Sequence, residues 1–170
     1  MEITDQMHRD AMSRVQSGKI NDKSINGSLS QYTGFIGEQV VMKYFDVKSV
    51  RYEYKGDKVY DYDLEVGQVK IDIKSLRRKS FISDKFEHAI PNYSQVMNCH
   101  LYIFVSVKIP DKRATEANIM GWCGHRWFWD NADSVDKGVF RDNGMTHKAD
   151  NSTIRYSQLK PIEDLILRFN

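Results

Sequence analysis

An α/β fold is predicted from three features: two amphipathic helices near the start of the chain, a β-hairpin, and one strongly apolar strand. Apolar residues recur every four positions over 3–16 and form a broad stripe over 35–45, as is typical of amphipathic helices. Residues 61–74 alternate polar and apolar side chains about a central Gly67. The run 101–107 is the most apolar of the chain, which favours a strand buried on both faces.

The segment between the two helices contains little material for a core. Residues 19–31 are rich in Ser, Asn and Gly and are predicted to form a loop. In the helix over 35–45, Glu38 lies at the margin of the apolar stripe. Gly34 and Gly37 are poor helix formers, so their presence near one another suggests that this helix closely approaches a sheet or a substrate.

The hairpin over 61–74 places charged residues on one face. Gly67 suits the first position of a two-residue type II′ turn. Counting outward from this turn predicts the pairs Val66–Val69, Glu65–Lys70, Leu64–Ile71, Asp63–Asp72 and Asp61–Lys74. Opposed side chains lie roughly 5 Å apart at Cβ, so Asp63 and Asp72 would bring two carboxylates together, with Lys74 on the same face. Convergent carboxylates of this kind commonly bind Mg²⁺.

These residues resemble the motif of a known superfamily. The resemblance is carried by Glu38 in the helix segment 34–41, and by Asp63, Asp72, Ile73 and Lys74. This set is similar to the PD-(D/E)XK nucleases, the restriction-endonuclease-like superfamily, although Tyr62 stands where the motif has proline. The resemblance implies an α-β-β-β-α-β core, in which a mixed central sheet is flanked by helices and the strand over 101–107 lies beside the metal-bearing strand.

The same resemblance implies a function and a role for each residue. It implies a metal-dependent deoxyribonuclease, endo- or exonucleolytic, that uses Mg²⁺, with Mn²⁺ as a substitute. The implied catalytic residues are Glu38, Asp63, Asp72 and Lys74. The implied metal ligands are Asp63, Asp72, the backbone carbonyl of Ile73, and Glu38 either directly or through water.

Candidate nucleic-acid contacts follow the hairpin. Arg77, Arg78 and Lys79 form a basic cluster shortly after Lys74, and we expect at least one of them to contact a DNA phosphate, since such contacts position a duplex without reading its sequence. Gln95 matches the polar residue that many members of the superfamily carry on the helix near the site.

Further elements complete the predicted core. Residues 49–54 alternate as a short strand before the hairpin. Pro91 is predicted to open a helix that continues through 92–97, because proline suits a first helical turn. The mixed segment 79–90 contains three large apolar residues, expected to pack over the sheet or to reach toward DNA: Phe81, Ile82 and Phe86.

The C-terminal part is predicted to hold shorter elements. These are a strand over 119–123, a short helix over 127–132, a loop over 133–152, an edge strand over 153–156 and a last helix that begins at Pro161. Its clustered aromatic residues are expected to pack in the core because they bury large areas: Trp122, Trp127, Phe128 and Trp129.

Length and composition narrow the class of protein. The 170 residues suit a single nuclease-like domain, with an N-terminal helix and loop over 1–31, the core with its site over 32–123, and a C-terminal extension over 124–170. The net charge is only +2, so a DNA surface must arise from local clustering. No apolar run is long enough for a membrane span and the start of the chain lacks signal-peptide features, so a cytoplasmic protein without membrane association is expected.

The same residues allow other interpretations. Strand charges are often only a solvated face, and the acidic spacing superficially resembles a calcium loop, although Val66 and Asp72 occupy the positions that require Gly and Glu. A zinc site using Cys123 lacks paired ligand spacing. A catalytically inactive DNA-binding protein, a junction-resolving nuclease and a metal-stabilised structural module remain alternatives. A homodimer is plausible, because cutting two strands usually needs two sites.

Overall fold

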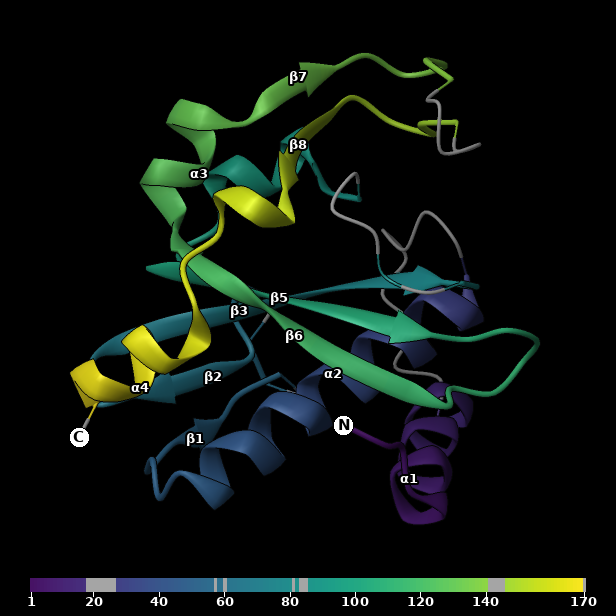
Figure 1. The fold of residues 1–170 in the computed structure, drawn as a ribbon, viewed down its shortest axis with the longest axis vertical. Coiled ribbons are helices and arrows are strands. Elements are labelled where there is room, and N and C mark those ends of the chain that lie inside the picture. Colours follow the sequence, from purple (N-terminus) through teal and green to yellow (C-terminus); the bar gives the residue numbers. More distant parts are fainter. Residues whose placement is uncertain are drawn as a thin grey trace.

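The fold combines a five-stranded mixed sheet, flanked by helices, with a separate three-stranded sheet (Figure 1). This computed structural model describes residues 1–17, 27–56, 58–59, 61–80, 82, 86–140 and 146–169. The larger sheet has the order β1-β2-β3-β5-β6 and the smaller β4-β8-β7. The strands are β1 (Glu53–Tyr54), β2 (Leu64–Val66), β3 (Val69–Arg78), β4 (Glu87–Pro91), β5 (Leu101–Lys108), β6 (Glu116–Gly124), β7 (Asp133–Val135) and β8 (Asn151–Arg155). The helices are α1 (Asp5–Gln16), α2 (Ser28–Val47), α3 (His125–Asn131), α4 (Ile162–Phe169) and the 3₁₀ helices η1 (Asn92–Val96) and η2 (Tyr156–Gln158).

The β2–β3 hairpin has the predicted register. Val66 pairs with Val69, and the ladder continues outward to Leu64 and Ile71. Gly67 has a φ of 59°, in the left-handed region that glycine adopts readily. The ladder ends at Leu64, so the predicted pairs of Asp63 with Asp72 and of Asp61 with Lys74 are not part of it.

Strands β3 and β5 are parallel, which makes the larger sheet mixed. Strand β5 is buried along nearly its whole length, which confirms the prediction of a strand covered on both faces. The connection between the two parallel strands contains β4 and η1. The helix predicted over 92–97 is therefore a short 3₁₀ helix, and Pro91 is the last residue of β4.

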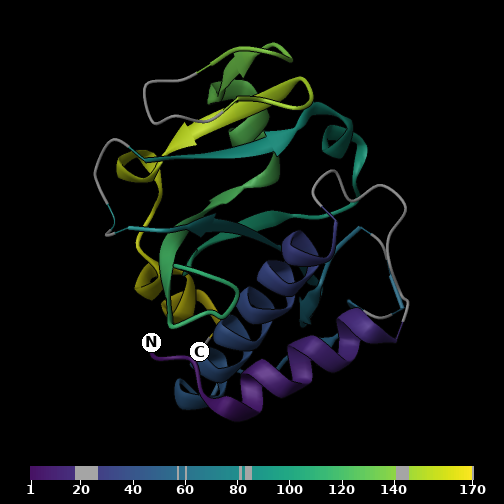
Figure 2. The same cartoon turned by 90° about the vertical axis from the view of Figure 1, so that its right-hand side faces the viewer.

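Helices α1 and α2 pack together on one face of the larger sheet (Figure 2). Helix α1 ends at Gln16 as predicted but begins at Asp5, two residues later than predicted, because the Thr4 side chain caps it by accepting a hydrogen bond from the backbone N–H of Met7 at 3.2 Å. Helix α2 begins at Ser28, earlier than predicted, and buries residues such as Ile36, Val40 and Phe45 against the sheet. Burial of this long apolar stripe extends the helix into a polar segment that has little helical signal of its own.

The smaller sheet lies on the opposite face of the larger one and was not predicted as a unit (Figure 1). Strand β8 was expected to be an edge strand but is central, because β4 and β7 pair with it on both sides. Strand β7 falls in the segment predicted as loop. A second apolar cluster fills the space between the two sheets and α3: Ile90, Cys99, Tyr102, Phe104, Cys123, Phe128 and Ile154.

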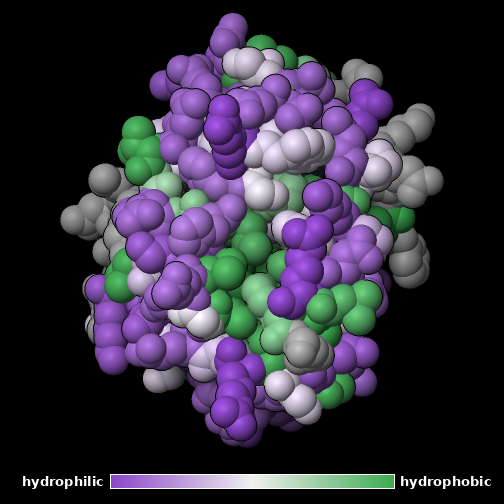
Figure 3. Space-filling view, turned by 90° about the vertical axis from the view of Figure 1, so that its left-hand side faces the viewer, coloured by the Kyte–Doolittle hydropathy of each residue, from purple (hydrophilic) through white to green (hydrophobic). Residues whose placement is uncertain are grey.

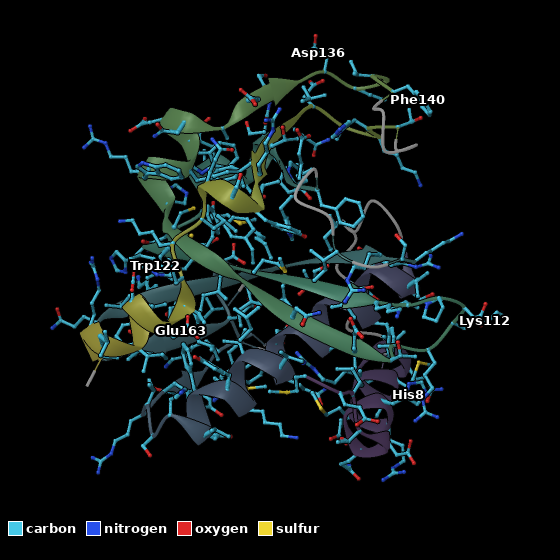
Figure 4. The ribbon with its side chains drawn as sticks, viewed as in Figure 1. His8, Lys112, Trp122, Asp136, Phe140 and Glu163 are labelled. Carbon is cyan, nitrogen blue, oxygen red and sulfur yellow. The ribbon has the colours of Figure 1, made fainter. Side chains whose placement is uncertain are left out.

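The aromatic residues that were predicted to pack in the core are buried to different extents. Phe128 is fully buried, Trp122 is 5% exposed and Trp127 is 39% exposed. Trp122 Nε1 donates to the carbonyl of Pro161 at 3.0 Å, which fixes β6 to the start of α4 (Figure 4). Of the apolar residues predicted to cover the sheet, Phe81 lies outside the described residues and Ile82 is exposed.

The surface beside α3 and α4 is polar around its rim, and apolar residues gather in a hollow near its middle (Figure 3). Leu167 of α4 is among the exposed large apolar residues. Within the described part of the chain, none of the helices has the combination of length and apolar character that a membrane span requires.

Replacing the two glycines of α2, Gly34 and Gly37, with alanine should change the stability of the protein in opposite directions. A Cβ on Gly37 would lie 1.8 Å from Ser75 Oγ and 3.0 Å from Ser75 Cβ, whereas a Cβ on Gly34 would meet no described atom within 4 Å. We expect Gly37→Ala to destabilise the protein by about 1–3 kcal/mol through overpacking and Gly34→Ala to stabilise it by about 1 kcal/mol through helix propensity. Urea unfolding measures the free energy of unfolding of both variants. Equal changes in the two variants would contradict the prediction.

Candidate functional site

The candidate site forms where β2 stops alongside β3. Asp63 is the residue just before β2, and its backbone N–H donates to the Ile71 carbonyl at 2.9 Å. Its side-chain Oδ2 accepts a hydrogen bond of 2.7 Å from the backbone N–H of Ile73. The Asp63 carboxylate thus accepts the Ile73 N–H hydrogen bond in place of a backbone carbonyl of β2. Because the N–H and C=O of one strand residue point to the same side, the Ile73 carbonyl also faces the side on which Asp63 lies.

Asp72 and Lys74 project together from β3. They alternate with Ile71 and Ile73, which belong to the core beneath α2. Lys74 Nζ lies 2.8 Å from Asp72 Oδ2, and both side chains are largely buried, with 21% and 9% of their surfaces exposed. Asp72 Oδ2 has no further hydrogen-bond partner among the described residues. The carboxylate and the ammonium therefore form one largely buried pair on a shared face of β3.

Glu38 reaches this region from α2, on the other face of the sheet. Glu38 is buried, with 8% of its surface exposed. Glu38 Oε2 accepts hydrogen bonds from Arg14 Nη1 at 2.9 Å and from the Tyr54 hydroxyl at 2.7 Å. The predicted catalytic residues are thus supplied by both faces of the sheet.

The charges of Glu38, Asp72 and Lys74 act on Asp63. Burial, and then the negative charges of Glu38 and Asp72, raise the pKa of Asp63 well above its ordinary value, although the Ile73 hydrogen bond and the charge of Lys74 oppose the shift. Burial disfavours the charged Lys74, but the adjacent Asp72 outweighs it, so the pKa of Lys74 is also raised. A bound cation would relieve the repulsion between these negative charges.

The residues fit a magnesium ion. In the described part of the chain no three acidic, histidine or cysteine side chains already converge as a complete metal cluster. Mg²⁺ does not require one, because it usually keeps several waters and binds one or two carboxylates. Asp63 and Asp72 supply hard oxygen donors and the Ile73 carbonyl faces the same side. The pKa of Asp63 is raised by burial and by the neighbouring acids even though Lys74 opposes the shift.

A layer of side chains beneath Lys74 was missed by sequence reasoning. The Lys74 ammonium lies 5.7 Å from the ring centroid of fully buried Tyr102. Tyr102 accepts a hydrogen bond from Trp129 Nε1 at 3.2 Å, and the same N–H lies 3.1 Å from His125 Nε2. His88 is buried nearby, and burial followed by the charge of Lys74 lowers its pKa to about 3. No local motif could have revealed this layer, since long-range packing assembles it.

The predicted nucleic-acid residues are not equivalent. Arg78 is 6% exposed, and its guanidinium donates to Ser106 Oγ at 3.0 Å and pairs with Glu116. It stabilises the end of β3 and is not presented to a ligand, which corrects its assignment as a phosphate contact. Arg77 is half-buried and donates to the carbonyls of Ile109 and Asp111.

Lys79 and Gln95 are exposed, as a contact to DNA requires. Gln95 lies on η1, in the connection between the parallel strands β3 and β5. The basic cluster lies away from the carboxylates, because at about 3.3 Å per residue β3 separates Asp72 from Arg77 by roughly 16 Å.

Comparison with known proteins gives no relative for this chain. No family model, no curated protein and no solved structure matches it. Function therefore has to be inferred from the geometry of the site itself.

Proposed function

We propose that this protein is a Mg²⁺-dependent deoxyribonuclease that hydrolyses phosphodiester bonds of DNA. The observation that carries the proposal is the pairing of Lys74 with Asp72 at 2.8 Å on β3, beside the Asp63 carboxylate, whose Oδ2 accepts a hydrogen bond from the Ile73 N–H at 2.7 Å. Two carboxylates, a strand carbonyl and a lysine on one side of a hairpin are the groups that metal-assisted phosphodiester hydrolysis requires.

A restriction-endonuclease-like core is part of the same proposal. Helix α2 precedes the antiparallel strands β1, β2 and β3, and β5 then adds parallel to β3. This order agrees with an α-β-β-β-α-β core, except that η1 and β4 take the place of the second helix. This order of elements supports the proposal.

Each side chain has a distinct chemical role in this proposal. Asp63 and Asp72 bind the metal, Glu38 adds a direct or water-mediated contact, and Lys74 steadies the attacking water and the negative charge that develops on the phosphorus centre. When bound, Mg²⁺ polarises a phosphodiester oxygen and lowers the pKa of a coordinated water. The Asp72–Lys74 ion pair keeps Lys74 protonated, so it acts as a hydrogen-bond donor and a cation.

The direct test is incubation of the purified protein with supercoiled, linear, single-stranded and four-way-junction DNA in Mg²⁺, Mn²⁺ or EDTA. We expect cleavage of at least one form with either metal and none in EDTA. Which form is cut identifies the substrate class. Binding of DNA without cleavage under every condition would contradict the proposal and favour a nuclease fold used only for binding.

A further inference from the structure

Arg14 joins the N-terminal helix to the candidate site. It lies in the last turn of α1, which packs beside α2 (Figure 2). Its guanidinium forms an ion pair with Glu38 through Nη1 at 2.9 Å, and its Nη2 donates to the hydroxyl of Tyr54. Tyr54 in turn donates to the same Glu38 oxygen at 2.7 Å. Three groups from α1, α2 and β1 thus close a small ring of hydrogen bonds.

The guanidinium is held in this position by packing. Its central carbon lies 3.7 Å from the centroid of the Phe35 ring and 5.3 Å from that of Tyr54. The Arg14 side chain is only 23% exposed. A planar guanidinium that stacks on a ring and donates through two nitrogens is strongly restricted in orientation, so it can transmit that restriction to the carboxylate it binds.

The consequence for Glu38 is a fixed carboxylate. Both of these hydrogen bonds end on Oε2, so Arg14 and Tyr54 together hold this oxygen of the carboxylate in place. Groups that orient a metal-binding carboxylate in this way commonly determine how well the metal binds. Tyr54 pairs with Leu64 between β1 and β2, and the backbone N–H of the next residue, Lys55, donates to the Asp63 carbonyl at 2.7 Å. The strand that carries Tyr54 therefore flanks Asp63, and the charge of Glu38 acts on that carboxylate.

We propose that Arg14 and Tyr54 are positioning residues that orient Glu38 toward the metal site. Helix α1 then contributes to metal binding through Arg14. The inference depends on the proposed function for the identity of the metal. It assigns a role to a helix that precedes the predicted core and to two residues that no motif of the sequence indicated. Their contribution is orientation, since neither is expected to contact the metal itself.

The test is Mg²⁺ binding measured by titration calorimetry on the full chain at constant pH and without DNA. Arg14→Lys and Tyr54→Phe both preserve the net charge, so a change in affinity reports the loss of orientation and not of charge. We expect each to weaken Mg²⁺ binding roughly tenfold, the lower end of the usual effect of a group that orients a ligand. Arg9→Lys is the matched control, because Arg9 lies on the same helix and donates to Gln6 at the exposed surface.

A double-mutant cycle separates positioning from general damage. In a Glu38→Gln background, Arg14→Lys and Tyr54→Phe are expected to have no further effect on Mg²⁺ affinity, because they act through Glu38. Circular dichroism verifies folding, and Tyr54→Phe removes a single hydroxyl, so it provides the result if Arg14→Lys does not fold. Wild-type affinity in both variants, or equal losses with and without Glu38, would overturn the inference while leaving the nuclease proposal intact. Absence of Mg²⁺ and Mn²⁺ binding to the wild type would overturn both.

Discussion

The Asp72→Asn protein is expected to bind DNA but to cleave it roughly 10²- to 10³-fold more slowly than the wild type, the usual effect of removing a group that stabilises developing charge. Asparagine keeps the shape of the side chain but removes the negative charge that binds the metal. It also removes the charge that faces Lys74 at 2.8 Å. Both the metal and the lysine therefore lose their partner, which makes this the largest single effect that we expect.

The measurement is a single-turnover cleavage assay alongside a gel-shift assay without divalent metal. Asp136→Asn is the control, since Asp136 is exposed at the outer end of the β7–β8 connection, far from the hairpin (Figure 4). We expect this control to cleave at the wild-type rate. Unchanged cleavage by Asp72→Asn would remove the basis for the proposed site, and loss of DNA binding as well would point to a structural role.

Asp63→Asn is expected to stabilise the metal-free protein at pH 8 while abolishing its response to Mg²⁺. Burial and the charges of Glu38 and Asp72 raise the pKa of Asp63 in the folded state. The folded protein therefore binds this proton more tightly than the unfolded chain does. Its free energy of unfolding falls as the pH rises above the ordinary Asp value of about 4, until Asp63 is ionised.

Asparagine carries no titratable proton and its side-chain oxygen can still accept the hydrogen bond from Ile73. The two proteins should therefore be similarly stable near pH 4, and the variant should be more stable at pH 8 by about 1–3 kcal/mol, the usual penalty for a buried polar group without compensation. Binding of Mg²⁺ to the folded state alone stabilises the wild type, by about 2.7 kcal/mol at a hundredfold excess over the dissociation constant. The variant should not respond.

Urea unfolding at pH 4, 6 and 8, with and without Mg²⁺, measures both effects. Asp136→Asn again provides the control, because its carboxylate is exposed. A variant that is less stable than the wild type at pH 8 would mean that Asp63 is not strained in the metal-free protein. An equal Mg²⁺ response in both proteins would mean that the metal binds elsewhere.

Short-range patterns were sufficient to predict much of the larger sheet. The β2–β3 register follows from alternation about Gly67, and the burial of β5 follows from its apolar run. The association of Asp72 with Lys74 also follows, since residues two apart on a strand share a face. These predictions succeed because each depends on neighbours along the chain or across one tight turn.

Long-range pairing decided the rest. In the smaller sheet, β4 and β8 pair residues as distant in sequence as Glu87 and Arg155, and these short strands carry little alternation. Arg78 has the same sequence context as Arg77, but strand alternation turns it into the interior, where it pairs with Glu116. Charge alone could not distinguish the two residues.

The sequence by itself determined the hairpin, its two acids and the adjacent lysine, because strand alternation and turn geometry are local properties. Only the tertiary structure decided that Arg14 and Tyr54 hold Glu38 and that Tyr102 lies beneath Lys74. The physical reason is that these contacts arise when helices pack on the two faces of a sheet, and the close approach of side chains distant in sequence leaves no periodic signal along the chain.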